Sequence, residues 1–168
     1  SRFSSRPRAT RALIRASVAR GSISRFAATS PAEAPSPTAR AAIASIRAAL
    51  AAGATRIGVI GTEGTIRSNA YQSALARAAP HVKVEAAPCP LFVPLAEEGW
   101  GDHPVTDQIA RHYLTPLLEW GAQALILGCT HYPLLKKVIG RVMGREVILV
   151  DSAEETALEV EHALTDLG

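Results

Sequence analysis

The chain has 168 residues, enough for one ordinary domain and a tail, and its 48% apolar content allows a packed core. No apolar run is long enough to span a membrane, and the two cysteines form neither a disulfide framework nor a zinc-type spacing. The net charge of +3 is uneven, because residues 1–40 carry eight Arg and one Glu while residues 41–168 carry 10 basic and 14 acidic side chains. The excess of basic residues therefore belongs to the tail and does not indicate a nucleic-acid-binding face on the folded part.

Residues 1–37 form an Arg- and Ser-rich tail that closes in a linker of Pro, Ser and Ala, and this composition predicts disorder. Three interpretations of the tail remain open. Its composition is typical of an organelle transit peptide, and it is also compatible with a basic arm for nucleic acid or anionic lipid. The third interpretation, which we favour, is out-of-frame or mis-started sequence upstream of a real domain.

From residue 38 onwards, helical and strand patterns alternate. In chain order we expect a helix over 38–52, a strand over 56–60, a helix over 65–79, a strand over 82–86, short and long helices over 92–98 and 104–120, a strand over 124–128, a helix over 133–143, a strand over 146–150, and a last helix capped by Asp151 or Ser152. This alternation predicts an α/β fold with an open, mainly parallel sheet flanked by helices.

Two polar segments follow predicted strands: GTEGT at 61–65 and GCTH at 128–131. Ligands of open parallel sheets bind beyond the carboxyl ends of the strands, so we expect the reactive residues there. Cys129 could act as a nucleophile, a metal ligand or a general base, and His131 could share or donate a proton. The alternatives are a small buried cysteine and a structural histidine. GTEGT lacks the residues of a nucleotide-binding loop, and no cluster has zinc spacing.

Four stretches resemble the glutamate racemases of the aspartate/glutamate racemase superfamily, in the same order. They are IGVIGTEGT (57–65) with Tyr71 downstream, CPLFVPLAEEG (89–99), LGCTHYPLL (127–135) and VDSAEETA (150–157). The resemblance covers residues 38–168, and HYPLL after GCT is the most specific part. It implies one domain of a two-domain fold and a cofactor-independent racemase with no metal. In such an enzyme two cysteines on opposite faces of the substrate exchange the α-proton of glutamate.

The resemblance also implies individual roles. Cys129 matches the second catalytic cysteine, and Thr130 matches a residue that hydrogen-bonds the substrate. His131 matches a residue that assists that cysteine and touches the substrate, and Glu97 matches the acid that works with it. From the residues alone, Glu97 and its neighbour Glu98 could equally be an ordinary solvated helix end.

The family's first cysteine, in a CNTAS-type motif, and its early DSGVGG-type motif are not found in this sequence. Cys89 cannot replace that first cysteine, because CPLF matches a different place in the family pattern. We therefore expect residues 38–168 to be the C-terminal part of a racemase-like domain, truncated at both ends, and the chain to be inactive alone. The resemblance further implies glutamate as the partner, no nucleic acid or membrane, a cytoplasmic location serving peptidoglycan synthesis, and allows a homodimer. Two alternatives stay open: a catalytically dead α/β ligand-binding fragment and an organelle protein with a transit peptide.

Overall fold

Four parallel strands form one sheet in the order β2-β1-β3-β4 in the computed structural model of the chain, which describes residues 37–167. The central strand β1 (Arg56–Gly61) pairs with β2 (Lys83–Pro88) on one side and with β3 (Ala124–Leu127) on the other. Strand β4 (Ile148–Asp151) pairs with β3. The predicted α/β fold with an open parallel sheet is thereby confirmed, whereas the predicted disorder of the tail concerns residues that, apart from Pro37, lie outside the described part.

Helices precede, connect and follow the strands. They are α2 (Pro37–Ala51), α3 (Glu63–Arg67), α4 (Ala70–Ala78), α5 (Phe92–Glu97), α6 (Pro104–Glu119), the 3-10 turn η2 (Tyr132–Leu135), α7 (Lys136–Met143) and α8 (Ser152–Leu167). Each parallel pair of strands needs such a crossover, because the chain has to return to the end of the sheet where the first strand began before the second strand can run in the same direction. No helix within the described range is both long and apolar enough to cross a membrane.

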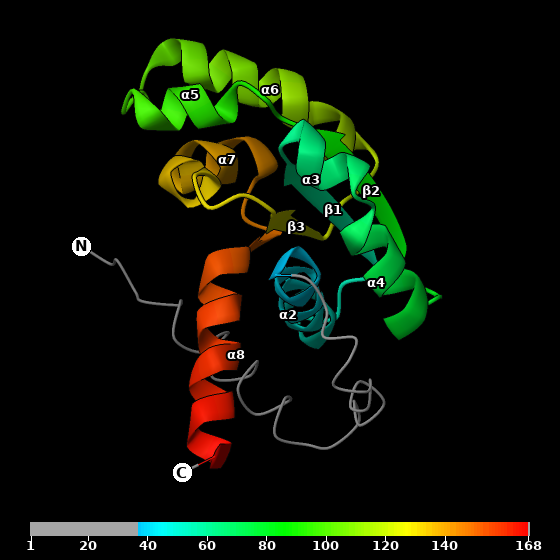
Figure 1. The fold of residues 1–168 in the computed structure, drawn as a ribbon. Helices are drawn as coiled ribbons and strands as arrows, with labels where there is room; N and C mark the ends of the chain where they lie inside the picture. The colour runs from blue at the N-terminus through cyan, green and yellow to red at the C-terminus, as the bar shows by residue number, and fades with distance from the viewer. Residues whose placement is uncertain (1–36, 168) are drawn as a thin grey trace, which may run out of the picture. The chain divides into compact units, whose positions relative to one another are not determined.

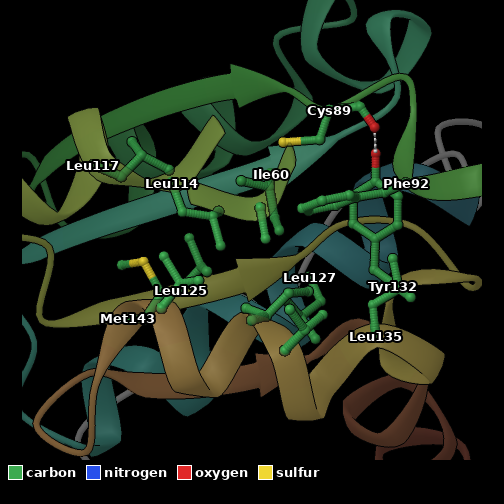
Figure 2. Packing of buried hydrophobic residues seen from close by; sticks show 14 of the residues in the cluster. Ile60, Cys89, Phe92, Leu114, Leu117, Leu125, Leu127, Tyr132, Leu135 and Met143 are labelled. Carbon is green, nitrogen blue, oxygen red and sulfur yellow. Dashed lines mark hydrogen bonds between the residues drawn. The ribbon is translucent and has the colours of Figure 1, made fainter. Parts of the chain in front are cut away.

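Both faces of the sheet are covered by helices, with α5, α6 and α7 on one side and α2 and α8 on the other (Figure 1). Successive side chains of a strand point to opposite faces. In β3, Leu125 and Leu127 therefore pack with the first group of helices, while Ile126 packs with the buried side chains of α2 and α4. Figure 2 shows the first of these two cores, in which aliphatic side chains from β1, β3 and α6 meet the rings of Phe92 and Tyr132.

The predicted helix over 65–79 is interrupted in the structure. Asn69 adopts a left-handed backbone conformation (φ 52°), and the chain forms α3 before it and α4 after it. Asparagine adopts this left-handed conformation more often than most residues, because its side chain is short and polar enough to hydrogen-bond to nearby backbone groups. The α3 helix also begins earlier than predicted, since the Thr62 hydroxyl caps it by accepting a hydrogen bond from the N–H of Thr65.

Candidate active site

A sharp turn at the carboxyl end of β3 presents the polar residues that the sequence singled out. The N–H of Gly128 donates the last sheet hydrogen bond to the carbonyl of Ile60 over 2.8 Å. A Cβ atom at position 128 would lie 2.9 Å from that same oxygen, which is closer than Cβ atoms approach other heavy atoms in proteins. The N–H of Tyr132 then bonds the carbonyl of Cys129. Glycine at position 128 therefore allows the end of β3 to approach β1 closely. The chain then turns, and this turn places Cys129 at the edge of the sheet.

Cys129, His131 and Glu97 lie in one row. The thiol sulfur of Cys129 is 3.8 Å from Nδ1 of His131, and Nε2 of the same ring is 3.3 Å from a carboxylate oxygen of Glu97. Glu97 is the last residue of α5, which lies against η2. The structure thus brings together all three residues that the family resemblance implied to be catalytic.

This row can move a proton between sulfur and imidazole. A carboxylate beside Nε2 favours a proton on that nitrogen, which leaves Nδ1 free to accept the thiol proton. When both ring nitrogens are protonated, the positive imidazolium stabilises a thiolate on Cys129. The Glu97 side chain is 60% exposed and that of His131 39% exposed, so water screens their attraction, and the pair supplies about 1 kcal/mol at most.

The neighbouring polar residues are placed differently. Thr130 is exposed on the same turn, between Cys129 and His131. Glu98 is also exposed, and its backbone N–H donates to the carbonyl of Pro94 at the end of α5. Across residues 37–167, no three His, Cys, Asp or Glu side chains gather closely enough to hold a metal ion.

Cys89 follows β2 at the same edge of the sheet, but its thiol is fully buried. Burial raises the pKa of this thiol to about 12, because a thiolate would lose its hydration there. The side chain packs among apolar residues of the core in Figure 2, and its sulfur interacts with the carbonyl of Ala87. Cys89 is therefore a structural cysteine, and it offers no second reactive thiol to a ligand at the sheet edge.

The start of α8 completes this edge. Asp151, at the end of β4, caps the helix by accepting hydrogen bonds from the N–H groups of Ala153 and Glu154. The Ser152 hydroxyl donates to the carbonyl of Leu127 over 2.6 Å and so ties α8 to the end of β3. The sequence left the choice of cap between Asp151 and Ser152 open, and the structure assigns the capping role to Asp151.

Sequence reasoning missed the contribution of Tyr132. Its ring is completely buried, and its hydroxyl donates a 2.8 Å hydrogen bond to the carbonyl of Cys89. The residue type gave a signal that Tyr132 could contribute, because a tyrosine can bury its ring while its hydroxyl donates to a buried acceptor. The acceptor, 43 positions away, is a backbone atom that no side-chain pattern identifies.

Comparison with known proteins places the chain in a family. Residues 11–160 match the family described as Asp/Glu/Hydantoin racemase. The chain is 60% identical over 118 residues to a glutamate racemase of Geobacter metallireducens and 51% identical over 112 residues to one of Syntrophus aciditrophicus. These matches cover 70% and 63% of the chain but only 44% and 42% of the relatives. The chain thus spans less than half the length of the curated relatives it matches.

Solved structures show the same likeness. A glutamate racemase of Bacillus anthracis matches with a TM-score of 0.72 at 39% identity, over 76% of this chain and 48% of that one. A glutamate racemase of Francisella tularensis, solved in complex with D-glutamate, matches with a TM-score of 0.67 at 32% identity, over 77% and 46% respectively. Sequence and fold agree, and the chain belongs to the Asp/Glu/Hydantoin racemase family.

Proposed function

We propose that this chain provides one half of a glutamate racemase site, in which Cys129 exchanges a proton with Cα of glutamate. The observation that carries the proposal is the row of Cys129, His131 and Glu97 at the carboxyl end of β3. Glutamate is proposed as the substrate because the full-length relatives are glutamate racemases, and one of them was solved with D-glutamate bound. We extend the proposal to a cytoplasmic role in supplying D-glutamate for peptidoglycan.

In the proposed reaction the Cys129 thiolate removes the α-proton from one face of glutamate. The S–H bond forms as the Cα–H bond breaks, and the electron pair stays on the substrate as a carbanion conjugated with the carboxylate. The His131 ring lies where, once protonated, it would stabilise the Cys129 thiolate, and Glu97 lies where its carboxylate would stabilise the protonated ring. The exposed hydroxyl of Thr130 is the group on this turn that can donate a hydrogen bond to the substrate.

Inversion needs a second acid on the opposite face, since a single rigid base returns the proton to the face from which it came. Cys89 cannot be this acid, because its thiol is buried and its pKa is raised to about 12 by burial. We therefore expect the 168-residue chain to exchange the α-proton of glutamate without inverting the configuration. A racemase site complete on both faces requires a group from outside residues 37–167.

Exchange in heavy water tests the proposal. The chain is incubated with L- and with D-glutamate, loss of the Cα proton signal is followed by NMR, and configuration is measured by chiral chromatography. We expect slow deuterium incorporation that Cys129→Ala abolishes and Cys89→Ala leaves in place. Equal exchange in the Cys129→Ala variant would contradict the assigned base. Binding of glutamate without any exchange would favour the alternative, a ligand-binding α/β fragment.

A further inference from the structure

One backbone oxygen anchors both segments that carry the Glu97–His131 contact. The carbonyl of Cys89 accepts a 3.1 Å hydrogen bond from the N–H of Phe92, at the start of α5. It also accepts the 2.8 Å hydrogen bond from the hydroxyl of Tyr132, drawn as the dashed line in Figure 2. Glu97 ends the helix that Phe92 begins, and His131 directly precedes Tyr132. The backbone segments that carry Glu97 and His131 are therefore both hydrogen-bonded to the carbonyl oxygen of Cys89.

The Cys89 carbonyl and the two groups that donate to it form a buried anchor. Cys89, Phe92 and Tyr132 are all 0% exposed, and the two rings pack edge to face with their centroids 5.3 Å apart. The N–H of Cys89 bonds the carbonyl of Gly61 at the end of β1, which fixes the anchor to the centre of the sheet. Because no water can replace a lost partner in such a place, the hydrogen bond of Tyr132 is costly to break.

The catalytic contact itself cannot hold its own geometry. Glu97 is exposed and His131 is partly exposed, and solvent-screened ion pairs do not constrain long side chains well. A further ion pair nearby, from Lys137 in α7 to Asp102 in the loop after α5 over 2.9 Å, is also exposed on both sides. The buried anchor is thus the firm link between α5 and the turn that follows β3.

We propose that Tyr132 is a positioning residue, which holds His131 at the distance from Glu97 that lets the carboxylate act on the imidazole. Burial raises the pKa of the Tyr132 phenol well above its usual range, so the hydroxyl stays protonated wherever thiols and imidazoles titrate. The inference deepens the proposed function, since it rests on His131 and Glu97 acting with Cys129. Its test nevertheless requires no racemase activity.

The test compares Tyr132→Phe with Tyr113→Phe in the full chain. Tyr113 packs edge to face on the same Phe92 ring at 5.4 Å, so the control removes one hydroxyl from the same aromatic cluster and leaves the hydrogen bond to Cys89 intact. The apparent pKa of Cys129 is read from the pH dependence of its alkylation, with and without Glu97→Gln. In the parent chain and in Tyr113→Phe, loss of the carboxylate should shift this pH profile so that Cys129 reacts about two- to threefold more slowly near neutral pH, as expected for a screened pair. In Tyr132→Phe the same change should produce less than about half of this shift.

An equal shift in both tyrosine variants, or no shift in the parent chain, would overturn the proposal even if Tyr132→Phe lowers stability. If Tyr132→Phe does not fold, the reciprocal measurement decides, because coupling between two groups acts in both directions. With carbon-13 at the tyrosine Cζ atoms, the Tyr132 resonance should move in Glu97→Gln and stay in place in the exposed neighbour Glu98→Gln. A resonance unmoved in both variants, or moved equally, would also refute the role. A chain that exchanges no α-proton still gives these titrations, so failure of the proposed function is recognised separately.

Discussion

Alkylation of Cys89 and Cys129 compares two thiols at the same edge of one sheet. Only the thiolate reacts, so the rate follows the ionised fraction and access to the sulfur. With its pKa raised to about 12, Cys89 is ionised at pH 7 in about one molecule in 100,000. An ordinary exposed thiol is ionised in about 3% of molecules at that pH, a ratio of about three thousand. Cys129 is partly exposed and adjoins an imidazole, so we expect it to react at least about a thousandfold faster.

The assay is pulsed alkylation with iodoacetamide near neutral pH, followed by peptide mapping with mass spectrometry. Both cysteines should react at similar rates once the chain is unfolded in guanidinium chloride, which controls for local sequence effects. Replacing His131 with Asn should slow the reaction of Cys129 and leave that of Cys89 unchanged. Faster labelling of Cys89 than of Cys129 in the folded chain would refute both the burial argument and the assignment of Cys129 as the reactive thiol.

Two further predictions concern stability. Gly128→Ala should lower the free energy of unfolding by about 1 to 3 kcal/mol, because the added methyl group meets the Ile60 carbonyl oxygen at 2.9 Å. The control Gly140→Ala should raise it by about 0.5 to 1 kcal/mol, because the added Cβ makes only an ordinary contact and the residue lies in a helix. Equal effects of the two substitutions in urea unfolding would contradict the steric argument. The raised pKa of Cys89 means that the unfolded chain loses its thiol proton first, so stability is complete below about pH 9 and falls towards pH 12 by up to about 1.4 kcal/mol per pH unit. Cys89→Ala should reduce this slope in alkaline urea titrations, and an unchanged slope would show that the thiol is not its source.

The sheet and most of the helices could be predicted because their signals are local. Strand β3 is a short apolar run after a turn, and α6 repeats apolar residues at helical spacing, so both were predicted within a residue or two. The break at Asn69 was missed, because helical periodicity continues across it and only one residue leaves the helical conformation. The turn η2 was predicted as part of a longer helix, since apolar spacing does not distinguish a 3-10 turn from the first turn of an α-helix.

Only part of the candidate site could be predicted from the residues alone. Cys129 and His131 could be inferred from their place after a strand, because the carboxyl ends of parallel strands carry ligand sites. Glu97 could not be chosen over Glu98 by any spacing rule, and it entered through the family resemblance. What separates the two acids is the tertiary contact between α5 and the turn after β3, where Glu97 reaches His131 over 3.3 Å. The Tyr132 hydrogen bond, to which our proposal assigns the positioning of His131, likewise pairs a side chain with a distant backbone atom.

The strand order also has a consequence for the sequence of folding events. Strand β1 pairs with β2 through Ile57 and Val84, but with β3 through Ile57 and Ala124, which are much farther apart along the chain. Closing the longer loop costs about 0.8 kcal/mol more in chain entropy, so we expect β1 and β2 to associate first. The turn that carries Cys129 is built onto the end of β3, and it acquires its geometry only when this later strand joins. A partly folded chain with β1 and β2 already paired would therefore carry a free thiol without the arrangement that makes it useful.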